Sequence, residues 1–158
     1  MMVTRLSADA RKVVLTSAAE EARRRGDRRL GTDHLLLGLL HDAESPVARA
    51  LGVDLASARA AADALDRAAL AAVGVDVAHV GDAPQPMWAH RHPGLTSGAR
   101  AVLKHTMLET RSSRSRNIET RHFLMALLAR ERPDPAAELL HALGIDRSQV
   151  RNRLDGSS

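Results

Sequence analysis

One eleven-residue stretch occurs twice in this chain and constrains the fold more than any other feature. Leu30–Leu40 reads L-G-T-D-H-L-L-L-G-L-L, and Ile118–Leu128, 88 residues later, reads I-E-T-R-H-F-L-M-A-L-L. One Thr, one His and three Leu residues occupy the same places in both copies. Similarity at a fixed offset indicates an internal repeat, which has to be considered before any other pattern.

Two further pairs of segments support the repeat. Leu6–Arg11 matches Leu95–Arg100 at an offset of 89, and Ala50–Asp54 matches Ala142–Asp146 at an offset of 92. The three matches come in the same order, so the chain is interpreted as two copies of one unit. We assign residues 1–74 to the first repeat, 75–94 to a linker containing Pro and Gly, and 95–158 to the second repeat.

The composition favours helices over sheets. The chain is 44% hydrophobic but holds one Phe, one Trp and no Tyr, so its core must be built from Leu, Ala and Val. Strands are enriched in aromatic and β-branched residues, whereas Leu and Ala are strong helix formers. We predict an all-α fold in which two repeats of about four helices, related by a pseudo-twofold axis, pack as one globular domain and a monomer.

Capping residues place the helix ends. Ser7 is predicted to begin a helix to about Arg25, and the run Arg23–Arg25 to decorate its solvated C-terminus. Thr32 and Thr120 are predicted N-caps of two central, buried helices, and Thr96 of the helix between them. Further helices are predicted after Pro46, after Asp54 or Ser57 to near Gly74, from the Pro133–Pro135 region through Leu143, and after Asp146.

Several classes of function lack the residues they require. There is no cysteine, and the longest nearly apolar run, Leu35–Leu40, is far too short to span a membrane. No P-loop, nucleophile-elbow or zinc-protease motif occurs. His34 is predicted to be a packing or hydrogen-bonding residue, and His79, His90 and His92 in a proline-rich segment do not make a metal site. We expect a cytosolic protein that is not an enzyme and has no cofactor or metal.

With these motifs, the chain resembles the N-terminal domain of the Clp/Hsp100 unfoldases, of the ClpC and ClpA type. The repeat of that family reads roughly F-T-x-R-A, then G-T-E-H-I-L-L-G-L-L, then a short segment ending in L-G-V. Gly31–Leu40 is a near-complete match to the second element. Leu51–Val53 and Leu143–Ile145 supply the third, so the resemblance covers Thr4 to about Leu154.

The resemblance implies a docking module without catalytic activity. Such domains receive substrates and adaptor proteins for ATPase rings that feed ClpP, and some are targets of cyclic peptide antibiotics. ClpC-type domains can also bind phosphorylated arginine, with acidic residues on the guanidinium and polar or basic residues on the phosphate.

The departures from the family pattern predict a degenerate phosphoarginine site. Asp33 keeps the acid of G-T-E-H, but Arg121 replaces it in the second repeat, where Glu119 lies two residues upstream. Asp9 and Gly98 stand where the family has the arginine of F-T-x-R-A. We assign one site to each repeat. In the first, Asp33 is expected to face the guanidinium, but Asp9 would repel the phosphate. In the second, Thr96 is present, but Arg121 stands where the acid should be and Gly98 where the arginine should be.

We predict that peptides still bind between the first helices of the two repeats. The candidate residues for binding ligands or partners are Val3, Leu6, Ser7, Arg11, Asp33, Leu95, Thr96, Arg100, Glu119 and Arg121.

Two alternatives remain open at this point. Arg111, Arg114, Arg116 and Arg121 could bind nucleic acid, although the net charge of +4 is modest and few aromatic residues are present to stack on bases. The chain could also be an excised N-terminal fragment of a full Clp ATPase.

Overall fold

The computed structural model describes residues 5–74, 94–112 and 115–157. The first repeat begins with strand β1 (Arg5–Leu6). One helical run follows, made of α1 (Ala8–Lys12), a π-helical segment η1 (Val13–Ser17) and α2 (Ala18–Arg24). Strand β2 (Arg29–Leu30) leads into α3 (Thr32–Leu39), and α4 (Pro46–Leu51) and α5 (Leu55–Ala72) complete the repeat.

The second repeat has the same order of elements. It consists of β3 (Gly94–Leu95), α6 (Ser97–Ser112), β4 (Asn117–Ile118), α7 (Thr120–Leu128), α8 (Pro135–Ala142) and α9 (Arg147–Asp155). Counting α1, η1 and α2 as one helix, each repeat contributes four helices to the described part of the chain. The predicted all-α fold with two repeats is therefore confirmed.

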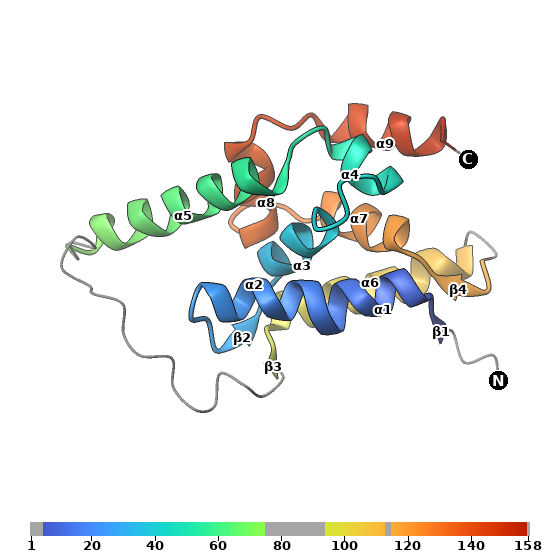
Figure 1. Cartoon of the computed structure of the whole chain (residues 1–158), viewed down its shortest axis with the longest axis horizontal. Coiled ribbons are helices and arrows are strands. Elements are labelled where there is room, and N and C mark those ends of the chain that lie inside the picture. Colours follow the sequence, from blue (N-terminus) through green and yellow to red (C-terminus); the bar gives the residue numbers. More distant parts are fainter. Residues whose placement is uncertain (1–4, 75–93, 113–114, 158) are drawn as a thin grey trace.

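Two short parallel strand pairs, which the sequence analysis did not predict, join the repeats. Arg5 and Leu6 of β1 pair with Asn117 and Ile118 of β4. Arg29 and Leu30 of β2 pair with Gly94 and Leu95 of β3. The pairs lie at opposite ends of the first helix of the first repeat (Figure 1). Each repeat thus gives one strand to each pair, which is the arrangement that a pseudo-twofold axis requires.

The core lies around α3 and α7, the two helices that carry the repeated sequence. Leu36 and Leu124 are 1% and 0% exposed, and Phe123 is 1% exposed. Short helices from both repeats surround them, because α3 contacts α2, α7 and α8, while α7 contacts α4, α6 and α9. Leu, Ala and Val make up most of this interior, as the composition predicted.

The prediction that Thr32 and Thr120 are N-caps is wrong. The N-caps are Gly31 and Glu119, and each donates its backbone N–H over 2.9 Å to the Nδ1 atom of the histidine three residues on. A side chain at this position that reaches back to the cap is half of a capping box. The predicted hydrogen-bonding role of His34 is confirmed, and His122 has the same role.

The π-helical segment explains the drift of the repeat offset from 89 to 88. Up to and including its first residue, buried Ala10 and Val13 correspond to Ala99 and Val102 at an offset of 89. After it, the buried residues Ala18 and Ala22 correspond to Thr106 and Thr110 at an offset of 88. One residue inserted into an α-helix forms a π-bulge. The first repeat therefore contains one inserted residue that keeps both flanks facing the core.

The last helices of the two repeats differ in length. Helix α5 has 18 residues and extends away from the body, whereas α9 has 9 (Figure 1). Ion pairs connect α2 and its C-cap residue Arg25 to α5: Arg24 with Asp63, Arg25 with Asp66, and Glu21 with Arg59.

No helix in the described ranges is long and apolar enough to cross a membrane. Val3, His79, Trp88, His90, His92 and Arg114 lie outside the described residues.

Candidate binding sites at the junctions of the two repeats

A cavity of about 800 Å³ lies beside the β2–β3 strand pair, and we call it the β2–β3 cavity. Residues from both repeats line it: Arg25, Asp33 and their neighbours from the first repeat, and Thr96, Gly98 and Asp134 from the second. Pairing of β2 with β3 explains this, because it brings the start of α3 next to the start of α6. The backbone N–H of Thr96 donates to the carbonyl oxygen of Leu30 over 3.0 Å.

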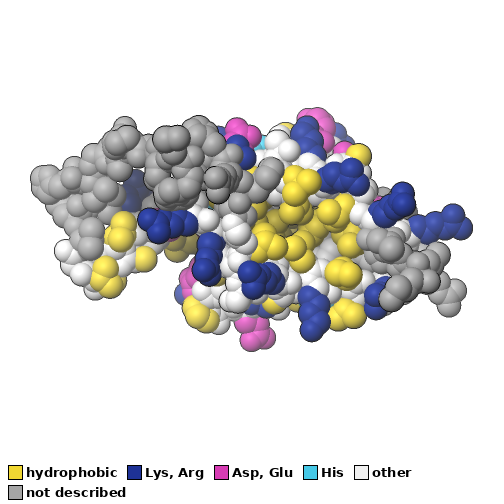
Figure 2. Space-filling model, turned by 90° about the horizontal axis from the view of Figure 1, so that it is seen from below, with side chains coloured by type: hydrophobic (Ala, Val, Ile, Leu, Met, Phe, Trp, Pro, Cys, Tyr) yellow, Lys and Arg dark blue, Asp and Glu magenta, His cyan; other side chains and the backbone are white. Residues whose placement is uncertain are grey.

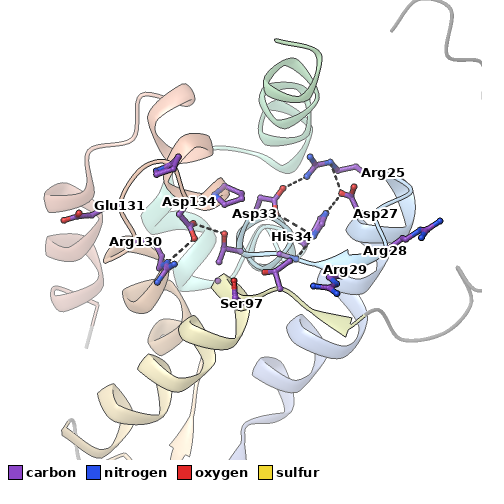
Figure 3. Close-up of a pocket in the computed structure, with 16 residues that line it drawn as sticks. Arg25, Asp27, Arg28, Arg29, Asp33, His34, Ser97, Arg130, Glu131 and Asp134 are labelled. Atoms are coloured by element: carbon purple, nitrogen blue, oxygen red, sulfur yellow. Dashed lines mark hydrogen bonds and ion pairs between the residues drawn. The ribbon is translucent and has the colours of Figure 1, made fainter. Parts of the chain in front are cut away.

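One wall of the β2–β3 cavity is a connected set of charged side chains (Figure 3). Arg25 donates to Asp33 over 2.5 Å, and its Nε lies 3.7 Å from Asp27. The Nε2 atom of His34 lies 2.7 Å from the carboxylate of Asp27. Because Nδ1 of His34 accepts the Gly31 N–H, the proton of the neutral ring is on Nε2 and is donated to Asp27.

The arginine run at the end of α2 was predicted to be solvated, but Arg25 is buried, with 8% of its side chain exposed. Burial by itself would lower the pKa of Arg25, but hydrogen bonds to Asp66 and Asp33 raise it above its ordinary value. The guanidinium is therefore a permanent cation held by carboxylates. Sequence reasoning missed this residue because the acid that holds it from α5 is 41 positions away.

The opposite wall joins the repeats through hydroxyl and carboxylate groups. Thr32 donates to Asp134 over 2.8 Å and accepts the backbone N–H of Ala136 over 3.1 Å. The hydroxyl predicted to cap its own helix thus helps to cap α8 of the other repeat. Arg130 donates to Asp134 over 3.0 Å. A Cβ atom on Gly98 would lie 3.2 Å from the Asp134 carboxylate and 3.8 Å from the Arg130 guanidinium, so both members of this pair stand close to where a side chain at position 98 would begin.

A second cavity of about 430 Å³ occupies the pseudo-equivalent place near the β1–β4 pair, and we call it the β1–β4 cavity. Asp9 and Thr120 line it, together with Lys12 and His41. Three more carboxylates belong to its lining, from Glu20, Asp42 and Glu44. Acidic side chains outnumber basic ones in this lining, whereas the β2–β3 cavity contains both signs in near balance.

The assignment of one ligand site to each repeat is wrong. The strand pairs place Ser7 and Asp9 beside the start of α7 in the other repeat: the Ser7 N–H donates to the carbonyl oxygen of Ile118, and Asp9 and Thr120 line one cavity. They likewise place Thr96 and Gly98 beside Asp33. Asp33 and Asp9, which we expected to oppose each other, therefore belong to different junctions. The sequence motif of one repeat therefore contributes residues to each of the two candidate sites.

The remaining predicted residues lie on the first helices and the strands before them. Ser7 and Thr96 are helix caps whose hydroxyls accept the N–H groups of Ala10 and Ala99. Leu6 and Leu95 are half-buried, and Arg11 and Arg100 are exposed. Sequence reasoning did not find Arg25, Arg130 or Asp134, and only the spacing of Arg130 and Asp134, four residues apart, gives a local signal.

Apolar side chains gather on the face of the molecule that carries the first helices of the two repeats, and basic side chains border them (Figure 2). We define the apolar face by residues of the first helices and the strands before them: Leu6 of β1, Val14 of η1, Leu95 of β3, and Leu103 and Met107 of α6. The first four are half-buried against the core, and Met107 is 43% exposed. A clustered apolar surface rimmed by polar groups is typical of an interaction site.

The sequence matches the family model for the Clp repeat N-terminal domain over residues 5–132. The chain belongs to this family. Among curated relatives of this Clp-repeat chain, the chaperone protein ClpC2 of rice chloroplasts is 30% identical over 156 residues, which are 97% of this chain and 15% of that protein. The negative regulator of genetic competence ClpC/MecB of Bacillus subtilis is 31% identical over 155 residues, 98% of this chain and 17% of that protein. The chain thus spans about a sixth of the length of these relatives.

Solved structures of Clp-type N-terminal domains have the same fold. The N-terminal domain of ClpD from Arabidopsis thaliana superposes with a TM-score of 0.70 at 18% identity, covering 97% of this chain and 96% of that one. The N-terminal domain of Hsp104 from Candida albicans superposes with a TM-score of 0.65 at 16% identity, covering 98% of this chain and 93% of that one.

The described residues of this Clp-repeat chain contain no group of three or more His, Cys, Asp or Glu side chains that could hold a metal ion.

Proposed function

We propose that this chain is a non-catalytic module that binds apolar segments of other proteins on its apolar face. The observation that carries the proposal is the exposure of apolar side chains where the two repeats meet, on a chain of the Clp repeat family (Figure 2). Relatives are named as chaperones and as ATP-binding subunits of the Clp protease. The partners we propose are therefore substrates, adaptors or subunits of a Clp chaperone–protease system.

The charges on the same helices favour one class of peptide. Arg11, Lys12, Arg100 and Lys104 are all exposed on α1 and α6. Opposite charges at the rim of an interface accelerate association and favour complementary partners. We propose that apolar segments flanked by acidic residues bind better than the same segments flanked by basic residues.

Fluorescence anisotropy with two labelled peptides tests the proposal. Both peptides carry the same apolar centre, one with Asp flanks and one with Lys flanks. We expect the Asp-flanked peptide to bind more tightly, and Met107→Glu to weaken its binding about tenfold or more, because a carboxylate then lies within the apolar contact. No saturable binding of either peptide to the unsubstituted protein would refute the proposal.

Val73→Glu is the matched control. Val73 is an apolar residue 74% exposed at the end of α5, outside the apolar face. The substitution Val73→Glu introduces the same charge with little effect on folding, so peptide binding should not change. Equal loss of binding in both variants would show that net charge, and not the apolar face, determines affinity.

The second part of the proposal concerns phosphoarginine. We propose that both junctions bind it poorly, for different reasons. At the β1–β4 junction, Asp9 and Arg121 have charges opposite to those of the family pattern. At the β2–β3 junction Asp33 is present, but it is already paired with Arg25.

A further inference from the structure

The pair formed by Arg25 and Asp33 separates two cavities. Both residues line the β2–β3 cavity, and both also line a third cavity of about 430 Å³ between α5 and the start of α8. Leu65, Ala69 and Leu139 supply apolar lining on the far side of the pair. The two side chains are thus a partition, and their contact is not an isolated surface ion pair.

Three carboxylates surround the single guanidinium of Arg25. Its two terminal nitrogens donate to Asp33 and Asp66 over 2.5 Å each, and its Nε faces Asp27 at 3.7 Å without a hydrogen bond. The side chain is 8% exposed, and that of Asp33 is 15% exposed. A planar fork of donors facing two carboxylates is the geometry that selects guanidinium over ammonium.

We propose that Arg25 is a built-in ligand of Asp33, which closes the β2–β3 cavity to arginine side chains of bound proteins. An incoming guanidinium would have to displace one that is buried, permanently charged and held by two carboxylates. The chain's own arginine wins this competition because it is covalently attached and therefore present at a high effective concentration. Arg25 is then a specificity-determining residue of the proposed binding module, and to that extent the inference rests on the proposed function.

The test uses a ligand that replaces the atoms removed by a substitution. Arg25→Ala deletes the side chain beyond Cβ, and ethylguanidinium has the same atoms as the deleted part. We expect this variant to bind ethylguanidinium saturably at one site per chain by calorimetry, at least about tenfold more tightly than the unsubstituted protein does. Its unfolding midpoint should rise with the ligand concentration.

Two controls define the site. Ethylammonium has the same charge but cannot form the fork of hydrogen bonds, so it should bind more weakly. Arg25→Ala combined with Asp33→Asn should lose the binding, because the acid that faces the cavity is then neutral. Equal binding of ethylguanidinium to the unsubstituted protein and to Arg25→Ala would overturn the inference, as would its failure to bind the variant.

Arg25→Gln, with unsubstituted guanidinium at low concentration, replaces Arg25→Ala if the latter does not fold. Loss of folding in both variants that neither ligand restores also counts against the inference. The Asp-flanked peptide assay on the same proteins keeps the two proposals separate. Unchanged peptide binding without a gain in guanidinium binding removes only the inference, and a guanidinium gain without peptide binding removes only the proposed function.

Discussion

The two repeats share a frame but differ in the layer that covers it. Val13–Ser17 is π-helical in the first repeat, whereas α6 is α-helical throughout. Glu21 is completely buried under Arg59 of the long α5, but the side chain of its counterpart Glu109 is 41% exposed and pairs with His105 on its own helix. The difference shows which positions the fold needs. The strand ends and the core-facing positions are equivalent in the two repeats, whereas the charged residues of the outer layer differ between them.

The two junctions differ in the same way. Both lie beside a strand pair and the start of a central helix, yet among the described residues arginines line the β2–β3 cavity and none lines the β1–β4 cavity. We therefore propose that the backbone frame sets where ligands can bind, and that a few charged side chains decide which ligands bind there. Four predictions test this division between a common frame and divergent side chains.

The largest effect is expected from the common frame itself. Leu36→Ala and Leu124→Ala each remove a fully buried side chain, and each should lower the free energy of unfolding by about 2–5 kcal/mol. Denaturant titration measures both. A loss outside this range in only one of the two variants, or an unchanged unfolding midpoint in either, would contradict equal roles for the two helices.

Next in size is the contrast between the two glutamates. Glu21→Ala leaves Arg59 and His41 without their buried partner. Because both can still reach water, we expect a loss of about 1–3 kcal/mol. Glu109→Ala removes an exposed pair and should cost at most about 0.5 kcal/mol. Similar losses for the two variants would mean that burial does not distinguish the repeats.

The pH dependence gives this second prediction a further test. Burial alone would raise the pKa of Glu21, but hydrogen bonds from Arg59 and His41 outweigh it and lower the pKa below its ordinary 4.5. A lowered pKa contributes stability above the unfolded-state value that is lost as the pH falls through the folded-state value. The advantage of the unsubstituted protein over Glu21→Gln should therefore shrink below about pH 4.5.

A smaller effect is expected from exchanging charges at the β1–β4 junction. Free phosphoarginine should bind the unsubstituted protein weakly, and Asp9→Arg with Arg121→Glu should improve binding about tenfold, equivalent to about 1.4 kcal/mol. The control makes the same exchange on α5, with Asp63→Arg and Arg67→Glu. Tight binding at two sites per chain without any substitution would refute the predicted degeneracy.

The smallest effect is expected from deleting one residue of the π-helical segment. Leu15 is 49% exposed, and without it the first helix would have the length of its counterpart. We expect the free energy of unfolding to change by about 1 kcal/mol or less, since both flanks keep their core faces. Deleting Leu103 from α6 is the control, because a regular α-helix then turns one flank by about 100° away from the core.

The sequence predicted the helices well because their signals are local. Ser7, Thr96 and Asp146 cap helices as predicted, Asp54 is the cap of the two alternatives Asp54 and Ser57, and the leucines of the repeated stretch form the core. The caps at Gly31 and Glu119 were missed because a histidine side chain, not a hydroxyl, provides the acceptor. The offset drift from 89 to 88 was visible, but only the structure shows that it marks a π-helical insertion.

The candidate sites were harder to predict because their halves come from different repeats. Two-residue strands give no periodic signal, yet the pairing of β2 with β3 decides that Asp33 faces Thr96 and not Asp9. From sequence alone, Arg25 is part of an arginine run predicted to be solvated, because its partner Asp66 on α5 is distant in sequence. Which charges neutralise one another depends on such long-range contacts, so a motif compared position by position cannot show whether Asp33 is available.

The exchange of strands between repeats also bears on how such a chain could arise. Two copies of a single repeat, related by a true twofold axis, would make an isologous dimer with two identical junctions. Joining the copies in one chain removes the need for identity, so that each junction can change alone. A substitution of Arg25 or Asp33, for example, changes residues that line the β2–β3 cavity and none that line the β1–β4 cavity. In a single chain, two junctions that exact symmetry would keep identical are thus free to diverge.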